Sequence, residues 1–240
     1  GWSRCNIDVV CQWKKIKPVE KNDIAPLLIG SFDLECTSED GTFPTPERKG
    51  DKIIQIGLTV TQYPEKHAYY KWIGVLGKSA EIEDATVVNC RTEADLLMAF
   101  RDVILELDLD LLTGYNIWGF DMKYVGVRGG QEMLKMPNKF WDMGKMRGVR
   151  AQYEEKRLSS SALGDNDLRM IHIPGRVVFD LMKVIQKDYK LDMYKLDFVA
   201  EHFIGLNKVD LTPNELFEIT GRYATGTERD AVYVCRIVLM

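Results

Sequence analysis

Short apolar runs in the first half of the chain predict the strands of a sheet. The first run extends from Leu27 to Glu35 and is apolar until its last residues, where carboxylates appear. Continuous apolar runs of this length are typical of buried strands. Runs of the same kind predict further strands over 53–60, 69–76, 111–115 and 177–180.

Helical spacing of apolar residues occurs between these runs and after them. It predicts a helix over 92–107 capped by Thr92, and a short helix over 120–127 that stops at Gly129. Residues 134–170 carry scattered charges and are interpreted as an exposed excursion. Early strands with helices interleaved later favour a mixed-sheet α/β domain. Further helices are predicted over 181–189, 195–203, 213–220 and 228–239.

The first 26 residues are mixed in composition, with four lysines around Pro18. We interpret residues 1–26 as the end of an upstream N-terminal domain, and residues 27–240 as the next domain. The chain opens without an initiator Met or a leader, which indicates an excerpt of a longer protein.

The composition is that of an ordinary globular chain. With 45% apolar and 28% charged residues, the chain can bury a proper core, which excludes a disordered tail. No run of about 18 uncharged apolar residues exists, so no membrane span is expected. Five cysteines without CxxC spacing predict reduced thiols, and three separated histidines argue against a His-rich zinc site. The net charge of −4 argues against a generally basic nucleic-acid surface.

The carboxylates of Asp33 and Glu35 are two residues apart on the first predicted strand, so both point to one face. Two anions this close raise each other's pKa unless a cation compensates. A divalent metal with oxygen ligands is the usual compensation. The alternative is a strand end that reaches water, with both carboxylates solvated.

Two further carboxylates, Asp121 and Asp230, lie near the starts of predicted helices. An Asp in the first turn is favourable with the helix dipole for structural reasons alone, and Asn116 suits an ordinary turn. Asp230 shares a stripe with Val234 and Ile237, where a salt bridge would satisfy it. From these residues alone, structural and functional roles both remain open.

Three segments resemble, in order and spacing, the exonuclease motifs of family B DNA polymerases. They are Ser-Phe-Asp33-Leu-Glu35-Cys, Tyr-Asn116-Ile-Trp-Gly-Phe-Asp121 and the segment around Asp230. The resemblance covers residues 22–240 and is closest to delta-type polymerases and those of large DNA viruses. Supporting stretches are Ile24-Ala-Pro-Leu, Gly41-Thr-Phe-Pro, Ile53-Ile-Gln-Ile and the segment 175–191.

The resemblance implies a ribonuclease-H-like fold, with a mixed sheet of five to six strands flanked by helices. It implies a 3′→5′ exonuclease that removes mispaired 3′-terminal nucleotides, with the polymerase palm, fingers and thumb absent from this chain. By the same resemblance, Asp33, Glu35, Asp121 and Asp230 hold two divalent cations, Mg²⁺ or Mn²⁺. These cations also offset phosphate charge, which explains how an acidic chain can act on DNA.

Other residues of the resembling segments are implied to bind the nucleic acid. Asn116 would contact the primer terminus, Phe120 would pack at the site, and Phe43 would contact a terminal base. Phe43 has the alternative of an aromatic tucked onto the core, and Asp180 is either a helix cap or a support for the site. The segment with Lys195 and Leu196 would contact the single strand, although the family often has Ser or Thr where Lys195 stands, and a solvated helix-start lysine is the alternative.

The third motif departs from the family pattern. The family usually has a water-positioning Tyr four residues before the Asp, where this chain has Gly226. Tyr223 and Tyr233 are the candidates to replace it. We expect Tyr223 to supply the hydroxyl, because Tyr233 suits core packing.

Two alternative functions stay open beside DNA proofreading. One is an RNA-directed 3′→5′ nuclease of the same fold. The other is a catalytically weak domain that binds a DNA strand or braces the polymerase, which Gly226 favours. The expected partners are single-stranded DNA or a primer 3′ end, the remainder of the polymerase and, through it, a sliding clamp. The expected location is the nucleus or a cytoplasmic replication compartment of a eukaryotic host cell.

Overall fold

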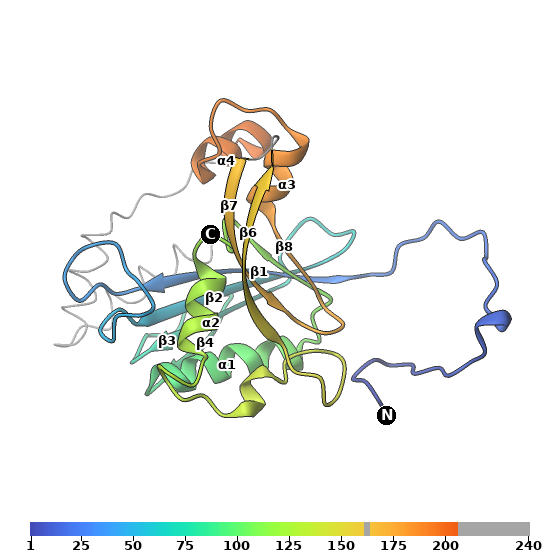
Figure 1. The fold of residues 1–240 in the computed structure, drawn as a ribbon, viewed down its shortest axis with the longest axis horizontal. Helices are drawn as coiled ribbons and strands as arrows, with labels where there is room; N and C mark the ends of the chain where they lie inside the picture. The colour runs from blue at the N-terminus through green and yellow to red at the C-terminus, as the bar shows by residue number, and fades with distance from the viewer. Residues whose placement is uncertain (161–163, 206–240) are drawn as a thin grey trace.

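The computed structural model describes residues 1–160 and 164–205, and its centre is a six-stranded sheet (Figure 1). The strand order is β4-β3-β2-β1-β5-β8. Within this sheet β2 runs opposite to the other five strands. This mixed α/β sheet confirms the predicted ribonuclease-H-like fold class. The strands are β1 Leu28–Cys36, β2 Ile53–Gln62, β3 Tyr70–Leu76, β4 Thr86–Cys90, β5 Leu111–Gly114 and β8 Val177–Asp180.

Helices flank the sheet at positions close to those predicted. Thr92 caps the first helix as expected, because its hydroxyl accepts a hydrogen bond from the backbone N–H of Asp95 at 3.1 Å. No helix in the described part of the chain is long and apolar enough to cross a bilayer. The helices predicted over 213–220 and 228–239 lie outside the described residues. The helices are α1 Glu93–Glu106, α2 Asp121–Arg128, α3 Leu181–Asp188 and α4 Leu196–Ile204, with short 3₁₀ turns η1 Trp13–Lys15 and η2 Asn138–Trp141.

One face of β1 packs against α1 and sets the direction of the acidic residues. Phe32 is buried, and its ring centroid lies 5.3 Å from that of Phe100 on α1. Leu34 is buried on the same side in the same core cluster. Because side chains alternate along a strand, Asp33 and Glu35 point to the opposite face, where Asp33 is exposed and Glu35 half-buried.

The expectation of an exposed excursion over 134–170 is confirmed only in part, because the first half of the segment is packed on the core and the second half is regular structure. The segment contains an antiparallel hairpin, β6 Gln152–Ser160 and β7 Gly164–His172, which rises from the sheet (Figure 1). Upstream of the hairpin, Phe140 is fully buried in the main core. Many residues of the hairpin strands are charged and exposed, among them the cross-strand partners Arg157 and Asp167, so the apolar alternation of a half-buried strand is missing.

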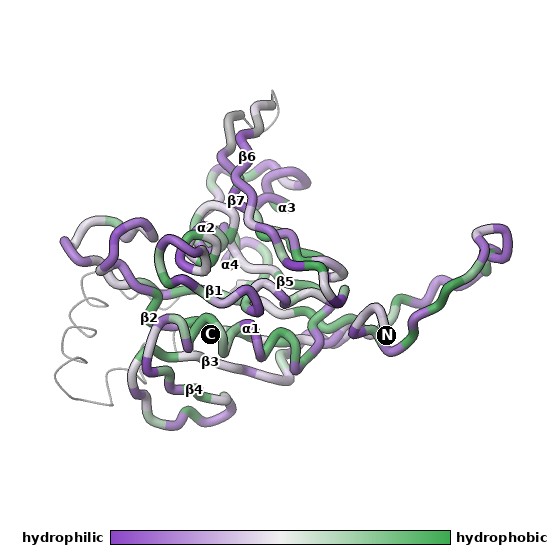
Figure 2. The backbone as a smooth tube through the Cα atoms, turned by 60° about the horizontal axis from the view of Figure 1, so that its bottom comes forward, coloured by the Kyte–Doolittle hydropathy of each residue, from purple (hydrophilic) through white to green (hydrophobic). Residues whose placement is uncertain are grey.

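The N-terminal arm, residues 5–26, extends away from the sheet (Figures 1 and 2). Every residue of the arm is exposed, although Figure 2 shows hydrophobic positions along it. The chain is held on both sides of the arm. The backbone N–H of Arg4 donates to the Lys145 carbonyl at 2.7 Å, and that of Tyr63 donates to the Leu27 carbonyl at 2.9 Å.

Candidate active site

The C-terminal half of β1 continues beyond its parallel neighbour β5. The two strands pair from Ile29 to Ser31, and β5 ends at Gly114. A Cβ added to Gly114 would lie 2.5 Å from the Phe32 carbonyl oxygen, so glycine is needed where the chain leaves the sheet. The uncovered edge of β1 is completed by a side chain, because the backbone N–H of Leu34 donates to Oδ1 of Asp121 at 3.1 Å.

Asp121 is the first residue of α2 and is only 3% exposed. Burial, followed by the negative charge of Asp33, raises the pKa of Asp121 well above its usual range. The hydrogen bond from Leu34 acts in the opposite direction but does not cancel the shift. The structure therefore brings Asp33 and Asp121 together at the uncovered edge of β1, with Glu35 two residues further along the same face.

The donor atoms of this site suit a hard divalent cation. Carboxylate oxygens are the ligands that Mg²⁺ and Mn²⁺ prefer, and a cation would offset the repulsion that raises the pKa of Asp121. Among residues 1–160 and 164–205, no three His, Cys, Asp or Glu side chains form a group that could hold a metal. Asp230, predicted as the fourth ligand, lies outside the described residues, and so do Tyr223, Gly226 and Tyr233.

The loop between β5 and α2 carries Asn116, which has a positive φ of 61°. Asn adopts this left-handed conformation more readily than most residues. Asp180, at the end of β8, is completely buried, and its carboxylate accepts hydrogen bonds from the backbone N–H groups of Asn116 and Trp118, both at 3.0 Å. It also accepts one from Met182 at 2.9 Å, which confirms its predicted role as a helix cap, here of α3.

Phe43 and Phe120, both predicted to lie at the nucleic-acid site, are in contact. Their ring centroids are 5.4 Å apart in an edge-to-face arrangement. Phe120 is half-buried and packs in turn against Tyr124 of α2. Phe43 remains 74% exposed, so the alternative of an aromatic tucked onto the core does not describe it.

Lys195 and Leu196 begin α4 and are both exposed. The phenol of Tyr115, directly before Asn116, donates to the Tyr194 carbonyl at 2.8 Å. This bond ties the start of α4 to the loop between β5 and α2. The two segments predicted to contact the nucleic acid are therefore neighbours.

The β1–β2 loop, residues 37–52, is organised by a residue that the sequence pattern does not single out. Asp51 is completely buried, and its carboxylate accepts hydrogen bonds from the backbone N–H groups of Glu39 and Thr45, both at 2.8 Å. The guanidinium of Arg48 donates to the same carboxylate at 2.7 Å. The loop that carries Phe43 is thus built around one buried charge.

Arg128 supports the same loop from α2. Its side chain is buried, forms an ion pair with buried Glu93, and donates to the Arg48 carbonyl at 3.1 Å. Glu93 also accepts a hydrogen bond from the backbone N–H of Ile53 at 3.0 Å. The burial of Arg128 could have been predicted from the sequence, because Arg128 follows Tyr124 by four residues and therefore lies on the same face of α2.

Comparison with known proteins finds one family model and many relatives. The model described as DNA polymerase family B, exonuclease domain, matches residues 2–199. The chain is 42% identical over 189 residues to the DNA polymerase of Pyramimonas orientalis virus. The matched region covers 78% of this chain and 15% of that protein. It is 36% identical over 229 residues to the DNA polymerase delta catalytic subunit of Dictyostelium discoideum, covering 95% and 20% respectively. With the delta catalytic subunit of Oryza sativa subsp. japonica, it shares 33% identity over 235 residues, covering 96% and 21%. The chain therefore spans about a fifth or less of the length of these relatives.

Proposed function

The chain belongs to DNA polymerase family B as an exonuclease domain, and on that premise we propose that it removes nucleotides from the 3′ end of single-stranded or mispaired primer DNA. The proposal is carried by the position of Asp121, which is buried against the uncovered edge of β1 and feels the charge of Asp33. A buried carboxylate whose pKa is raised by burial and by a neighbouring negative charge is typical of functional sites.

Asp33, Glu35, Asp121 and Asp230 are the residues that would hold two divalent cations, Mg²⁺ or Mn²⁺. Such cations, when bound, supply an activated water and a counter-charge for the leaving 3′ oxygen. The protein contributes preorganisation. Asp33 and Glu35 stand on a strand of the sheet, and the Leu34 N–H holds Asp121 in place before substrate arrives.

The neighbouring residues would orient the end of the DNA strand. Phe43 offers an exposed ring supported by Phe120, which suits stacking on a terminal base. Asn116 would contact the primer terminus. Lys195 would bind phosphate as a point charge at the start of α4, next to Leu196.

The test uses the complete polymerase chain and 5′-labelled substrates with Mg²⁺ or Mn²⁺. We expect wild type to shorten single-stranded DNA and mispaired primers from the 3′ end. Asp33→Ala with Glu35→Ala should abolish this shortening while DNA affinity stays nearly unchanged. Faster cleavage of RNA would support the RNA nuclease instead, and an inactive wild type that still binds DNA would support the strand-binding domain. Wild-type cleavage by the double variant would refute the proposed site.

The attacking water needs a positioning group, and we propose the hydroxyl of Tyr223, because Gly226 stands at the usual place of this phenol. We expect Tyr223→Phe to lower the hydrolysis rate and Gly226→Tyr to raise it. Two unchanged rates would show that the water is positioned by another residue.

Residues 1–26 would belong to an upstream N-terminal domain of the polymerase. Large apolar side chains such as Val10 and Trp13 are 92% and 77% exposed, and an apolar surface of this kind marks an interaction site. Amide exchange in the arm should therefore be slow in the complete polymerase and fast in residues 1–240 alone. Equal exchange in both would contradict this assignment.

The proposal extends to the remaining partners and to the location of the complete protein. We propose that the complete protein works at nuclear or viral replication sites in a eukaryotic host cell. A sliding clamp would bind through parts of the polymerase beyond this chain. Co-purification of a clamp with the full polymerase, but not with residues 1–240, would be the expected result.

A further inference from the structure

Asp180 has more hydrogen bonds than a helix cap needs. A cap satisfies the first free N–H groups of its own helix, and the bond from Met182 to Oδ1 does this for α3. Two further bonds come from the loop between β5 and α2: Asn116 donates to Oδ1, and Trp118 donates to Oδ2. The carboxylate is completely buried, so it is not shared with water.

We propose that Asp180 is a positioning residue for the exonuclease reaction. Its hydrogen bonds fix the position of the loop carrying Asn116 relative to Asp121. This inference rests on the proposed function. Asn116 and Trp118 are the only two residues of the 115–120 loop whose N–H groups are shown donating to a side chain among the described residues. Both donate to this one carboxylate, and the loop leads directly into Asp121.

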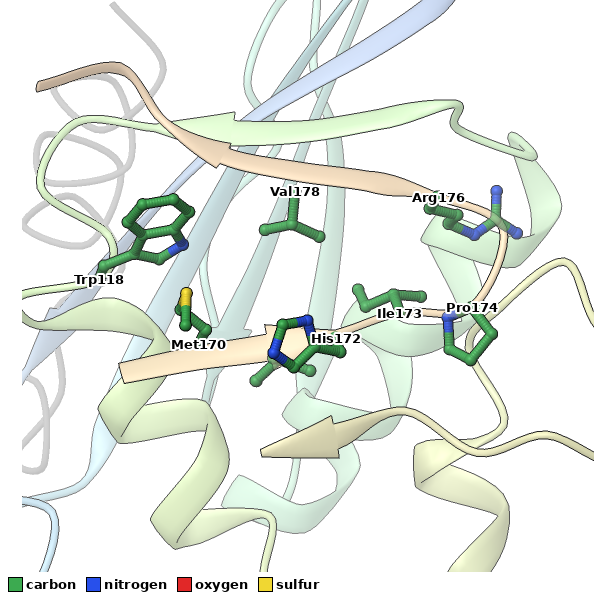
Figure 3. Close-up of a pocket in the computed structure, with 8 residues that line it drawn as sticks. Trp118, Met170, His172, Ile173, Pro174, Arg176 and Val178 are labelled. Atoms are coloured by element: carbon green, nitrogen blue, oxygen red, sulfur yellow. The ribbon is translucent and has the colours of Figure 1, made fainter. Parts of the chain in front are cut away.

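Trp118 is held from a second side, which makes the loop a bridge between β8 and β7. Its carbonyl accepts a hydrogen bond from the backbone N–H of Arg169 on β7 at 3.2 Å. Its ring lies at one end of a pocket of about 200 Å³, with Val178 of β8 along the wall and Arg176 at the other end (Figure 3). If the bonds to Asp180 are removed, the support from β7 remains, so we expect a displaced loop rather than an unfolded one.

Asp180→Ser separates the cap from the loop support. Serine is a good N-cap and retains the bond to Met182. Its single, shorter hydroxyl cannot also accept from Asn116 and Trp118. Asp180→Asn is the milder variant, because its Oδ1 still accepts from Asn116 and Met182 while its NH₂ group faces the Trp118 N–H. Thr92→Ala is the matched control, since it removes the cap of another helix, α1, and no hydrogen bond of the 115–120 loop.

The variants are compared in the complete polymerase, on a mispaired primer, at a temperature where all are folded. We expect kcat to fall roughly 10- to 100-fold in Asp180→Ser, less in Asp180→Asn, and not in Thr92→Ala, while KM stays within about threefold of wild type. Wild-type kcat in both Asp180 variants would overturn the proposal. If Asp180→Ser does not fold, Asp180→Asn alone decides.

Amide exchange gives a second readout that does not depend on activity. The N–H groups of Asn116 and Trp118 should exchange faster in Asp180→Ser, while those at the start of α3 stay protected. Unchanged exchange at both positions would also overturn the inference. Failure of the proposed function is distinguishable, because wild type would then show no hydrolysis even though this exchange difference is present.

Discussion

The N-terminal arm and the β1–β2 loop are both long segments without regular strands, yet they lie on the protein in opposite ways. The arm is rich in large apolar residues, and all of its residues are exposed. The loop is rich in polar residues, and it closes around the buried carboxylate of Asp51 and the buried guanidinium of Arg128. Apolar content therefore does not decide which of the two segments is held in place.

The difference lies in where the backbone polar groups find partners. A buried backbone N–H or carbonyl must be hydrogen-bonded, and in the loop one carboxylate accepts from Glu39 and Thr45 while Arg128 donates to the Arg48 carbonyl. The arm has no comparable charged centre among the described residues. The irregular segment that holds the exposed ring of Phe43 in place thus depends on buried charge.

The largest effect is expected from Arg128→Met. Removing one partner of a buried ion pair leaves Glu93 uncompensated, which typically costs about 3–5 kcal/mol. Urea unfolding at neutral pH measures the loss. Adding Glu93→Gln should recover part of it, because the amide oxygen still accepts from Ile53 without a buried charge. A loss below about 1 kcal/mol would show that the pair does not support the loop.

Asp51→Asn should have the next largest effect. One oxygen is replaced by a donor that faces N–H groups, so the free energy of unfolding should fall by about 1–3 kcal/mol. Hydrogen exchange should become faster at Glu39 or Thr45. Lys49→Ala, an exposed change in the same loop, is the control and should stay within about 0.5 kcal/mol of wild type. Equal effects of the two substitutions would remove the distinction between buried and exposed loop charges.

A pH titration of Asp40 tests the hydrogen bonds on the exposed side of the loop. Hydrogen bonds from Thr42, with the charge of Arg48, lower the pKa of Asp40 to about 2. Because the folded-state pKa is below the ordinary value, the stabilisation is complete above about pH 4 and is lost as the pH falls towards 2. Carboxyl-carbon NMR should show this low midpoint in wild type and a higher one in Thr42→Val. An ordinary midpoint in wild type would contradict the loop geometry.

The smallest effect is expected from Trp13→Ser in the arm. Within residues 1–240 the Trp13 side chain is already 77% exposed, so its removal should change the free energy of unfolding by less than about 0.5 kcal/mol. The measurement is urea unfolding of residues 1–240. A larger loss would mean that the arm packs on this domain itself.

Most of the strands that could be predicted from the sequence bury apolar side chains. The runs of β1, β2, β3 and β5 stand out because the sheet packs them into its core, whereas β8 is recognised by three consecutive apolar residues although none of them is fully buried. β4, Thr86–Cys90, is short and partly exposed, so it lacks such a run. The hairpin of β6 and β7 is held by its own ladder of bonds and by opposite charges, which single-residue hydropathy does not register.

For the site, the sequence predicts the carboxylates but not what holds them. The pairing of Asp33 with Asp121 follows from motif order, and the structure places the two together. The bonds from the Asn116 and Trp118 backbone to Asp180 span more than 60 residues. Such contacts depend on the parallel pairing of β5 with β8, which no local pattern contains. Asp230 and Tyr223 stay predictions.

The opposed direction of β2 has a practical consequence for engineering. The parallel strands β1, β5 and β8 all begin at one end of the sheet. They finish at the opposite end, where Asp121 and Asp180 lie. The turn from β2 to β3, residues 63–69, therefore lies at the strand ends opposite to these carboxylates, and all of its residues are exposed. A fluorophore or an affinity tag placed in this turn would report on the domain from the end of the sheet opposite to these carboxylates.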